Sequence, residues 1–177
     1  MTVTIRRAQP ADAAVLAGVA AATFPLACPP HTTEDAQAEF IRTVLSEERF
    51  AEYLADTSRV LLIAVDSASG AIGYTMVNLG EPLDEDVRAA IRIRPTSELS
   101  KCYVLPGHHG AGVARELMTV SLEAAAEAGA SGMWLGVNEE NAKAQRFYGK
   151  NGFERVGAKR FLVGDRLEDD WVMERRV

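Results

Sequence analysis

The spacing of hydrophobic side chains changes several times along the chain, and each change predicts a new element. Residues 3–7 alternate between apolar and polar, as a half-buried strand does. Residues 10–23 place Val15, Leu16 and Val19 on one side of a helix, which Pro10 is well suited to open. Further strands are predicted at residues 59–66, 71–79, 97–105 and 132–138, with an antiparallel pair closing the chain. Further helices are predicted at residues 32–45, 47–55, 84–91, 112–128 and 141–150.

Polar residues and glycines mark where several of these helices begin and end. Thr32 and Asp35 have the spacing of a capping box at the start of the second helix. Gly129 is a suitable C′ residue for the helix over residues 112–128. Asn141 is expected to cap the next helix, and the pair Asn151-Gly152 is expected to end it.

The order of the predicted elements indicates the fold class. Three consecutive strands at 59–66, 71–79 and 97–105 predict an antiparallel meander. The strand at 97–105, the helix after it and the strand at 132–138 predict one right-handed parallel crossover. We therefore expect an α/β (α+β) protein with a mixed, mostly antiparallel sheet of six to seven strands and helices on both faces. Residues 1–177 are expected to form a single domain.

Composition and charge narrow the classes of function. Of 177 residues, 47% are hydrophobic and 25% are charged, and the formal net charge is -6. This acidic balance with no basic face argues against nucleic-acid binding and suits a cationic small molecule or basic peptide. Cys28 and Cys102 have no metal-ligand spacing, so we expect reduced thiols, a cytoplasmic protein and no metal. No apolar run approaches the ~20 residues of a membrane span, so no membrane partner is expected.

The stretch "YVLPGHHGAGVARELM", residues 103–118, carries the clearest candidate site. Gly110, Gly112 and Ala114 leave the backbone bare where a strand passes into a helix. A helix N-terminus offers unpaired N–H groups and partial positive charge, so a phosphate or pyrophosphate is the natural ligand. A tight turn that binds nothing would show the same glycines.

Two motifs together resemble the GNAT acetyltransferase superfamily. The run from His109 to Ala114 is similar to its acyl-CoA loop, in which Arg or Gln is followed by two residues, Gly, one residue, and Gly or Ala. The stretch "VNEENAKAQRFYGKNGFERVG" is similar to its later motif. His109 stands where Arg or Gln is usual, and Ala111 where a basic residue is common, which puts the strength of phosphate binding in doubt.

The resemblance implies that acetyl-CoA binds as co-substrate. The strand from residue 97 would pair its splayed edge with the pantetheine amides, and the glycine loop would hold the pyrophosphate. The implied contacts are Tyr103, Val104, Leu105, His109, Gly110, Ala111, Gly112, Val113, Ala114, Arg115, Asn138, Asn141, Phe147 and Lys150.

The resemblance also implies a catalytic set for direct acetyl transfer to an amine. Tyr148 would protonate the departing thiolate, although it could instead only pack its helix on the sheet. Glu98 would take a proton from the ammonium, with Ser100 positioning a water, unless Glu98 is a solvated residue at the strand end. A backbone N–H near a bulge around Val104 would support the oxyanion. By alternation Glu98, Ser100 and Cys102 should share one face, where Cys102 is expected to be a core residue rather than a nucleophile.

The identity of the amine that accepts the acetyl group is the part of the function that the sequence determines least. Acidic residues between 31 and 56 would form an acidic entrance for a cationic amine, or would only be solvated helix faces. A likeness to bacterial polyamine acetyltransferases favours a small cationic amine, and a protein amine stays open. The alternatives are a non-catalytic acyl-CoA-binding sensor or assembly domain, and a protein that uses the loop for ATP or NAD. Because dimerisation is common in the superfamily, a homodimer is a further expectation.

Overall fold

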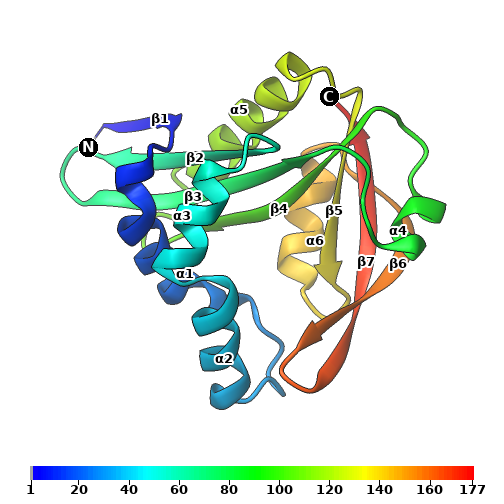
Figure 1. Ribbon diagram of the computed structural model, residues 1–177, viewed down its shortest axis with the longest axis horizontal. Coiled ribbons are helices and arrows are strands. Elements are labelled where there is room, and N and C mark those ends of the chain that lie inside the picture. The colour runs from blue at the N-terminus through cyan, green and yellow to red at the C-terminus, as the bar shows by residue number, and fades with distance from the viewer. Residues whose placement is uncertain (1) are drawn as a thin grey trace.

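A seven-stranded mixed sheet forms the centre of the computed structural model, which describes residues 2–177 (Figure 1). The strand order is β1-β2-β3-β4-β5-β7-β6, and β4 and β5 are the parallel neighbours. The strands are β1 Val3–Arg7, β2 Arg59–Asp66, β3 Gly70–Leu79, β4 Thr96–Val104, β5 Gly132–Asn138, β6 Glu154–Val163 and β7 Arg166–Arg176. The predicted fold class, the meander and the single parallel crossover are confirmed.

Helices cover both faces of this sheet (Figure 1). They are α1 Ala13–Ala27, α2 Glu34–Val44, α3 Glu47–Ala55, α4 Glu85–Ala90, α5 Val113–Glu127 and α6 Ala142–Lys150, with a 3-10 turn at Pro10–Asp12. One predicted cap is wrong, because α2 is capped by Thr33, whose side chain accepts a hydrogen bond from the Ala36 N–H, and not by Thr32. The predicted caps at Gly129 and Asn141 are confirmed: Gly129 has φ +94° after α5, and Asn141 caps α6.

The two faces of the sheet carry separate hydrophobic cores. One core packs α5 and α6 against the sheet through residues such as Leu117 and Met118, which are almost fully buried. The other packs α1, α2 and α3 on the opposite face through residues such as Leu16 and Phe50, which are equally buried. The sheet therefore separates two compartments, and side chains from one can meet those from the other only where the sheet is interrupted.

Helix α1 is unusually apolar. The segment Pro10–Ala27 is long and apolar enough to cross a membrane by length and composition, which the sequence reading did not anticipate. Leu16, Val19, Ala20 and Phe24 on this segment are at most 6% exposed and pack into the core beneath it. These core contacts account for part of the apolar character of the helix, since 33% of the segment is buried.

An irregularity in β4 changes the predicted arrangement of its side chains. Met76 of β3 pairs with Lys101, whereas the next residue, Val77, pairs with Leu99, so Ser100 is an extra residue in β4. A bulge of this kind shifts the alternation by one position. Leu99 and Cys102 consequently lie in the α5 core, while Tyr103 lies in the α1 core. The expectation that Glu98, Ser100 and Cys102 share a face by simple alternation is wrong, and the bulge lies at Ser100 rather than around Val104.

Candidate active site

Strands β4 and β5 separate soon after they begin to pair. Their ladder joins Thr96, Ser97 and Glu98 to residues 132–134, and beyond Glu98 the two strands diverge (Figure 1). The Leu105 N–H donates to Ile72 of β3, and backbone groups alternate along a strand, so the N–H groups of Val104 and Cys102 point into the gap. The gap is an opening in the sheet with unpaired strand edges on its sides.

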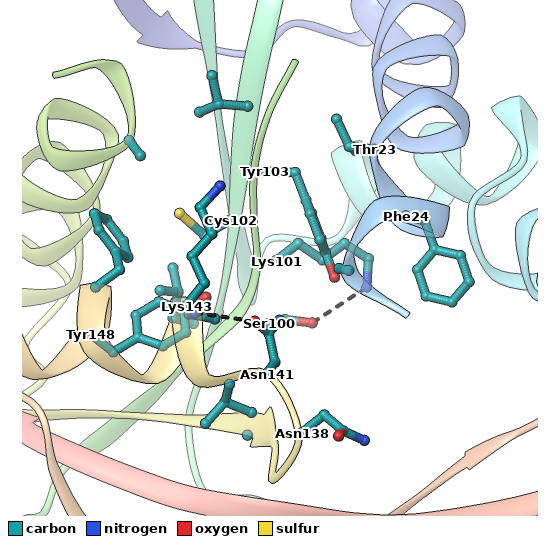
Figure 2. A pocket seen from close by; sticks show the side chains of 18 of the residues that line it. Thr23, Phe24, Ser100, Lys101, Cys102, Tyr103, Asn138, Asn141, Lys143 and Tyr148 are labelled. Atoms are coloured by element: carbon teal, nitrogen blue, oxygen red, sulfur yellow. Dashed lines mark hydrogen bonds between the residues drawn. The ribbon is translucent and has the colours of Figure 1, made fainter. Parts of the chain in front are cut away.

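A cavity of about 1350 Å³ passes through this gap. Its wall includes Cys102, Ala144 and Tyr148 from the α5 face and Phe24 and Tyr103 from the α1 face. Figure 2 shows Cys102 and Tyr148 on the side of α5 and α6, and Tyr103 and Phe24 on the side of α1, with Ser100 between them. Molecules entering from opposite faces of the sheet can therefore meet at β4.

The glycine loop forms one end of the cavity on the α5 face. Gly110 has φ +89° and Gly112 has φ +80°, a region that glycine adopts more readily than other residues. No atom lies within 4 Å of the position that a Cβ would take at either glycine. Gly112 is the N-cap of α5, so the free N–H groups of that helix begin at an open surface. This geometry fits the predicted phosphate site.

Most of the residues predicted to contact acetyl-CoA line the cavity. They are Tyr103, Val104, His109, Gly110, Gly112, Ala114, Arg115, Asn138, Asn141, Phe147 and Lys150. Leu105, Ala111 and Val113 are not part of the cavity wall. Leu105 packs in the α1 core, and Val113, the first residue of α5, is buried in the core between that helix and the sheet. His109 turns back toward β4, where its Nε2 lies 2.6 Å from the Val104 carbonyl oxygen and donates to it.

Tyr148 stands on α6 at the wall of the gap. Its ring packs edge-on against Phe147 and Phe153, with centroids 5.4 Å and 6.0 Å away. Burial raises the pKa of Tyr148 well above its usual value, so the phenol keeps its proton at neutral pH. Asn141 uses its side-chain oxygen to accept from the Ala144 N–H at 3.1 Å, which leaves its amide NH₂ available at the cavity wall.

Glu98, Ser100 and Lys101 form the β4 wall of the cavity. Glu98 accepts a hydrogen bond from the Asn78 amide at 2.9 Å, and Lys101 Nζ lies 3.5 Å from Ser100 Oγ (Figure 2). Burial lowers the pKa of Lys101 to about 8, with Glu98 acting in the opposite direction. Sequence reasoning missed Lys101, because the bulge decides which face it occupies.

Two further cavity carboxylates, both on β7, were not predicted from the sequence. Glu168 and Asp170 are 6% and 7% exposed, and both line the cavity. His31 Nε2 lies 2.6 Å from Glu168 Oε1, which explains the placement of that histidine. Burial, followed by the nearby Glu168 and Asp169 charges, raises the pKa of Asp170 to about 6, although Lys159 opposes the shift. The available signal in the sequence was the alternation of side chains along β7, which places Glu168 and Asp170 on the same face of the strand.

The helix side of the cavity carries only positive side chains, whereas its strands carry both signs. Arg115, Lys143 and Lys150 line it from α5 and α6. The strands contribute three carboxylates, Glu98, Glu168 and Asp170, and three cations, Lys101, Lys159 and Arg175. An anionic ligand is therefore favoured on the helix side, and the carboxylates for a cationic ligand are all on the strands.

The predicted acidic entrance from residues 31–56 is wrong. The acidic side chains on α2 and α3 are exposed to solvent, and none of those described lines the cavity. Glu39 pairs with Arg42 and Glu52 with Arg49, each at 2.8 Å along its own helix. The periodic charge run therefore belongs to solvated helix faces, and the acidity near the gap comes from other strands.

A match to a protein-family model shows to which family the chain belongs. The model of the acetyltransferase (GNAT) family matches residues 23–153, which include β4, the glycine loop and α6. The chain belongs to the GNAT family. It is therefore an acyltransferase of the N-acetyltransferase type, and acetyl-CoA is the co-substrate of such enzymes.

Similar proteins agree with this membership. An uncharacterized N-acetyltransferase of Mycobacterium tuberculosis is 46% identical over 166 residues, which cover 94% of this chain and 98% of that protein. The PaiA N-acetyltransferase of Thermoplasma acidophilum, solved with coenzyme A, has a TM-score of 0.78 at 20% identity, with all of both chains covered. The spermidine/spermine N-acetyltransferase of Vibrio cholerae has a TM-score of 0.67 at 20% identity, covering 98% of this chain and 93% of that one. The two structures support the GNAT fold.

Cys102 lies at the cavity of this GNAT domain but is poorly suited to act as a nucleophile. Burial raises the pKa of its thiol to about 12, so the reactive thiolate is scarce at neutral pH. Among the residues that the structure describes, no group of three His, Cys, Asp or Glu side chains could hold a metal ion.

Proposed function

We propose that this GNAT enzyme transfers the acetyl group of acetyl-CoA directly to the nitrogen of a small cationic amine. The observation that carries this proposal is the cavity through the β4–β5 gap, which has only cations among the charged side chains of its helix side and has all three of its carboxylates on the strands. Acetyl-CoA carries several negative charges and suits the helix side, while the strand carboxylates can bind a positive amine.

The helix side has the features needed to hold acetyl-CoA. The N-terminus of α5, with Gly110 and Gly112 leaving it bare, suits the pyrophosphate. The free edge of β4 offers the Val104 N–H, which lies nearer the glycine loop, to an amide of the pantetheine arm, much as a sheet edge accepts a peptide. Asn138 and Asn141 would contact the arm from the opposite wall, and Arg115 and Lys150 would assist the phosphates.

The chemical roles follow from where the side chains lie. Tyr148 would donate its proton to the departing thiolate, since its raised pKa keeps the phenol protonated. Glu98 would accept a proton from the amine, with Ser100 placing a water between them. The Cys102 N–H, which faces the gap beside the bulge at Ser100, would support negative charge on the carbonyl oxygen of the acetyl group, in place of the N–H around Val104 expected from the sequence.

Cellular location and assembly remain proposals. Cys28 and Cys102 are both free, which fits the cytoplasm. We retain the expectation that residues 1–177 act as one domain. We also retain a homodimer as the assembly to test by light scattering, alongside the monomer.

Thermal melting with different ligands, followed by thiol release, tests the proposed function. We expect acetyl-CoA and CoA to raise the melting temperature, ATP and NAD to leave it unchanged, and thiol release from acetyl-CoA to depend on an added amine. Stabilisation without thiol release on any amine would support a sensor or assembly domain instead. Stabilisation by ATP or NAD alone would contradict the assignment of the glycine loop.

A further inference from the structure

Asp170 is a buried carboxylate without a partner. It is 7% exposed, and its side chain has no hydrogen bond or ion pair within residues 2–177. A Cβ placed on Gly136 of β5 would lie 3.3 Å from Asp170 Oδ2 and 2.9 Å from Lys159 Cε, so the carboxylate and the stem of the lysine both reach the β5 side of the gap. A cation bound at the gap would give the carboxylate the ion pair that it lacks.

The other two carboxylates of the cavity already have partners. Glu98 accepts from Asn78 at 2.9 Å. Glu168 contacts His31 at 2.6 Å and Arg166 at 3.6 Å. Lys159 is the cation that acts on Asp170, but its Nζ lies over the rings of Phe161 and Trp134, 5.4 Å and 5.8 Å from their centroids. Of these three carboxylates, Asp170 alone makes no hydrogen bond or ion pair within residues 2–177, although Lys159 lies beside it.

Aromatic rings line the cavity beside Asp170. Phe24 and Phe40 stack with centroids 4.4 Å apart, and Phe161 meets Phe40 edge-on at 5.7 Å. Asp170 pairs across the β6–β7 ladder with Lys159, two residues from Phe161 on the same strand face. Diagonal neighbours of this kind are ~7 Å apart, which is short enough for a two-carbon chain to join an ammonium to a ring.

We propose that the amine acceptor is a monocation with an aromatic ring two to three carbons from its nitrogen, and that Asp170 holds its ammonium group. This inference rests on the proposed function, because the acceptor is the second substrate of that transfer. The ring packs against Phe40 and Phe161 in offset or edge-on contact. A polyamine fits less well, since its further ammonium groups would meet apolar rings or approach Lys101.

A comparison of amines tests the substrate class. With acetyl-CoA saturating, we expect kcat/KM for 2-phenylethylamine to exceed that for n-butylamine and for spermidine by about tenfold or more. Phe161→Ala should remove the preference over n-butylamine while leaving the KM for acetyl-CoA unchanged. Higher kcat/KM for spermidine than for 2-phenylethylamine would overturn the inference and leave the proposed function intact.

The role of Asp170 is tested with its neighbour as the control. Asp170→Asn should raise the KM for 2-phenylethylamine by about 10- to 100-fold with little change in the KM for acetyl-CoA. Asp169→Asn removes an exposed carboxylate at the adjacent position and should leave both values unchanged. Equal behaviour of the two variants would overturn the assignment of Asp170.

Direct binding separates this inference from the proposed function. Calorimetric titration of 2-phenylethylamine into the CoA-bound protein measures acceptor binding without turnover. Binding that is lost in Asp170→Asn supports the inference even where no thiol is released, an outcome that would refute catalysis. Turnover of other amines without detectable binding of 2-phenylethylamine would refute the inference alone.

Discussion

At the scale of single residues, burial sets the protonation of the groups around the gap. Tyr148 is kept neutral, the pKa of Lys101 falls to about 8, and the pKa of Asp170 rises to about 6. In each case desolvation disfavours the charged form. A protonated phenol and a carboxylate with a raised pKa therefore line the same cavity.

Replacement of Tyr148 tests the proton donor. Tyr148→Phe keeps the ring packing against Phe147 and Phe153 but removes the hydroxyl, so we expect kcat to fall by about 10²-fold with little change in acetyl-CoA affinity. Thiol-release kinetics and calorimetry measure the two quantities. Tyr53→Phe, which removes a hydroxyl from α3, is the control. An unchanged kcat in Tyr148→Phe would refute the assigned role.

The pH dependence of acceptor affinity tests Asp170. Because its pKa is raised to about 6, the carboxylate is ionised at pH 7.5 and becomes neutral as the pH falls through 6. The KM for a cationic amine should therefore rise as the pH is lowered from ~7.5 to ~5, and Asp170→Asn should lack this rise. Lys159, Glu168, Asp169 and Tyr103 surround the group, so the same profile of Asp169→Asn serves as the control. A wild-type KM that stays constant would contradict the assignment.

At the scale of elements, the ends of helix α5 provide a matched test of the phosphate site. Gly112 before the helix has φ +80° and Gly129 after it has φ +94°, and a Cβ would meet no atom within 4 Å at either position. Gly112→Asp and Gly129→Asp should therefore introduce comparable backbone strain. We expect Gly112→Asp to weaken acetyl-CoA binding by at least about tenfold, because it places negative charge at the pyrophosphate. Equal affinities in calorimetry would remove the loop from the binding site.

Helix α1 gives a second test at this scale. Leu16 is fully buried under the sheet, whereas the adjacent Val15 is 46% exposed. Leu16→Ala should lower the free energy of unfolding by about 2–5 kcal/mol, and Val15→Ala should change it by less than about 0.5 kcal/mol. Urea denaturation measures both. Similar small effects would contradict the packing of this apolar helix as a core element.

The helices and strands could be predicted from the sequence because the spacing of their hydrophobic residues is a local property of the chain. Strand and helix spacing, and the glycine and asparagine signals at helix ends, each depend on a few neighbouring residues. The bulge at Ser100 could not be predicted in this way, because one inserted residue leaves β4 reading as an ordinary strand while it exchanges the faces of the side chains that follow.

The candidate site likewise has one part that could be predicted from the sequence and one that could not. The glycine loop and the stretch around Tyr148 are continuous in sequence, so their role could be proposed before the structure. The wall of the cavity also brings together Phe24, Phe40, Phe161 and Asp170 from segments far apart in the chain. Only the tertiary fold places these residues beside one another.

At the scale of the whole molecule, the sheet acts as a partition with one opening. The α5 face carries Arg115, Lys143, Lys150 and the bare helix N-terminus, and the opposite side has aromatic rings of the α1 core with both carboxylates and lysines from the strands. The gap between β4 and β5 lets the two substrates meet without an intermediate carrier on the protein. This arrangement favours direct transfer of the acetyl group in a ternary complex of the protein with both substrates.

Initial-rate kinetics with both substrates varied test this claim most directly. Direct transfer predicts double-reciprocal lines that intersect, because both substrates must be bound before the thiol leaves. It also predicts that the mass of the protein stays unchanged after incubation with acetyl-CoA alone. Parallel lines, together with a protein that has gained one acetyl group, would show a covalent acetyl-enzyme and would contradict the account.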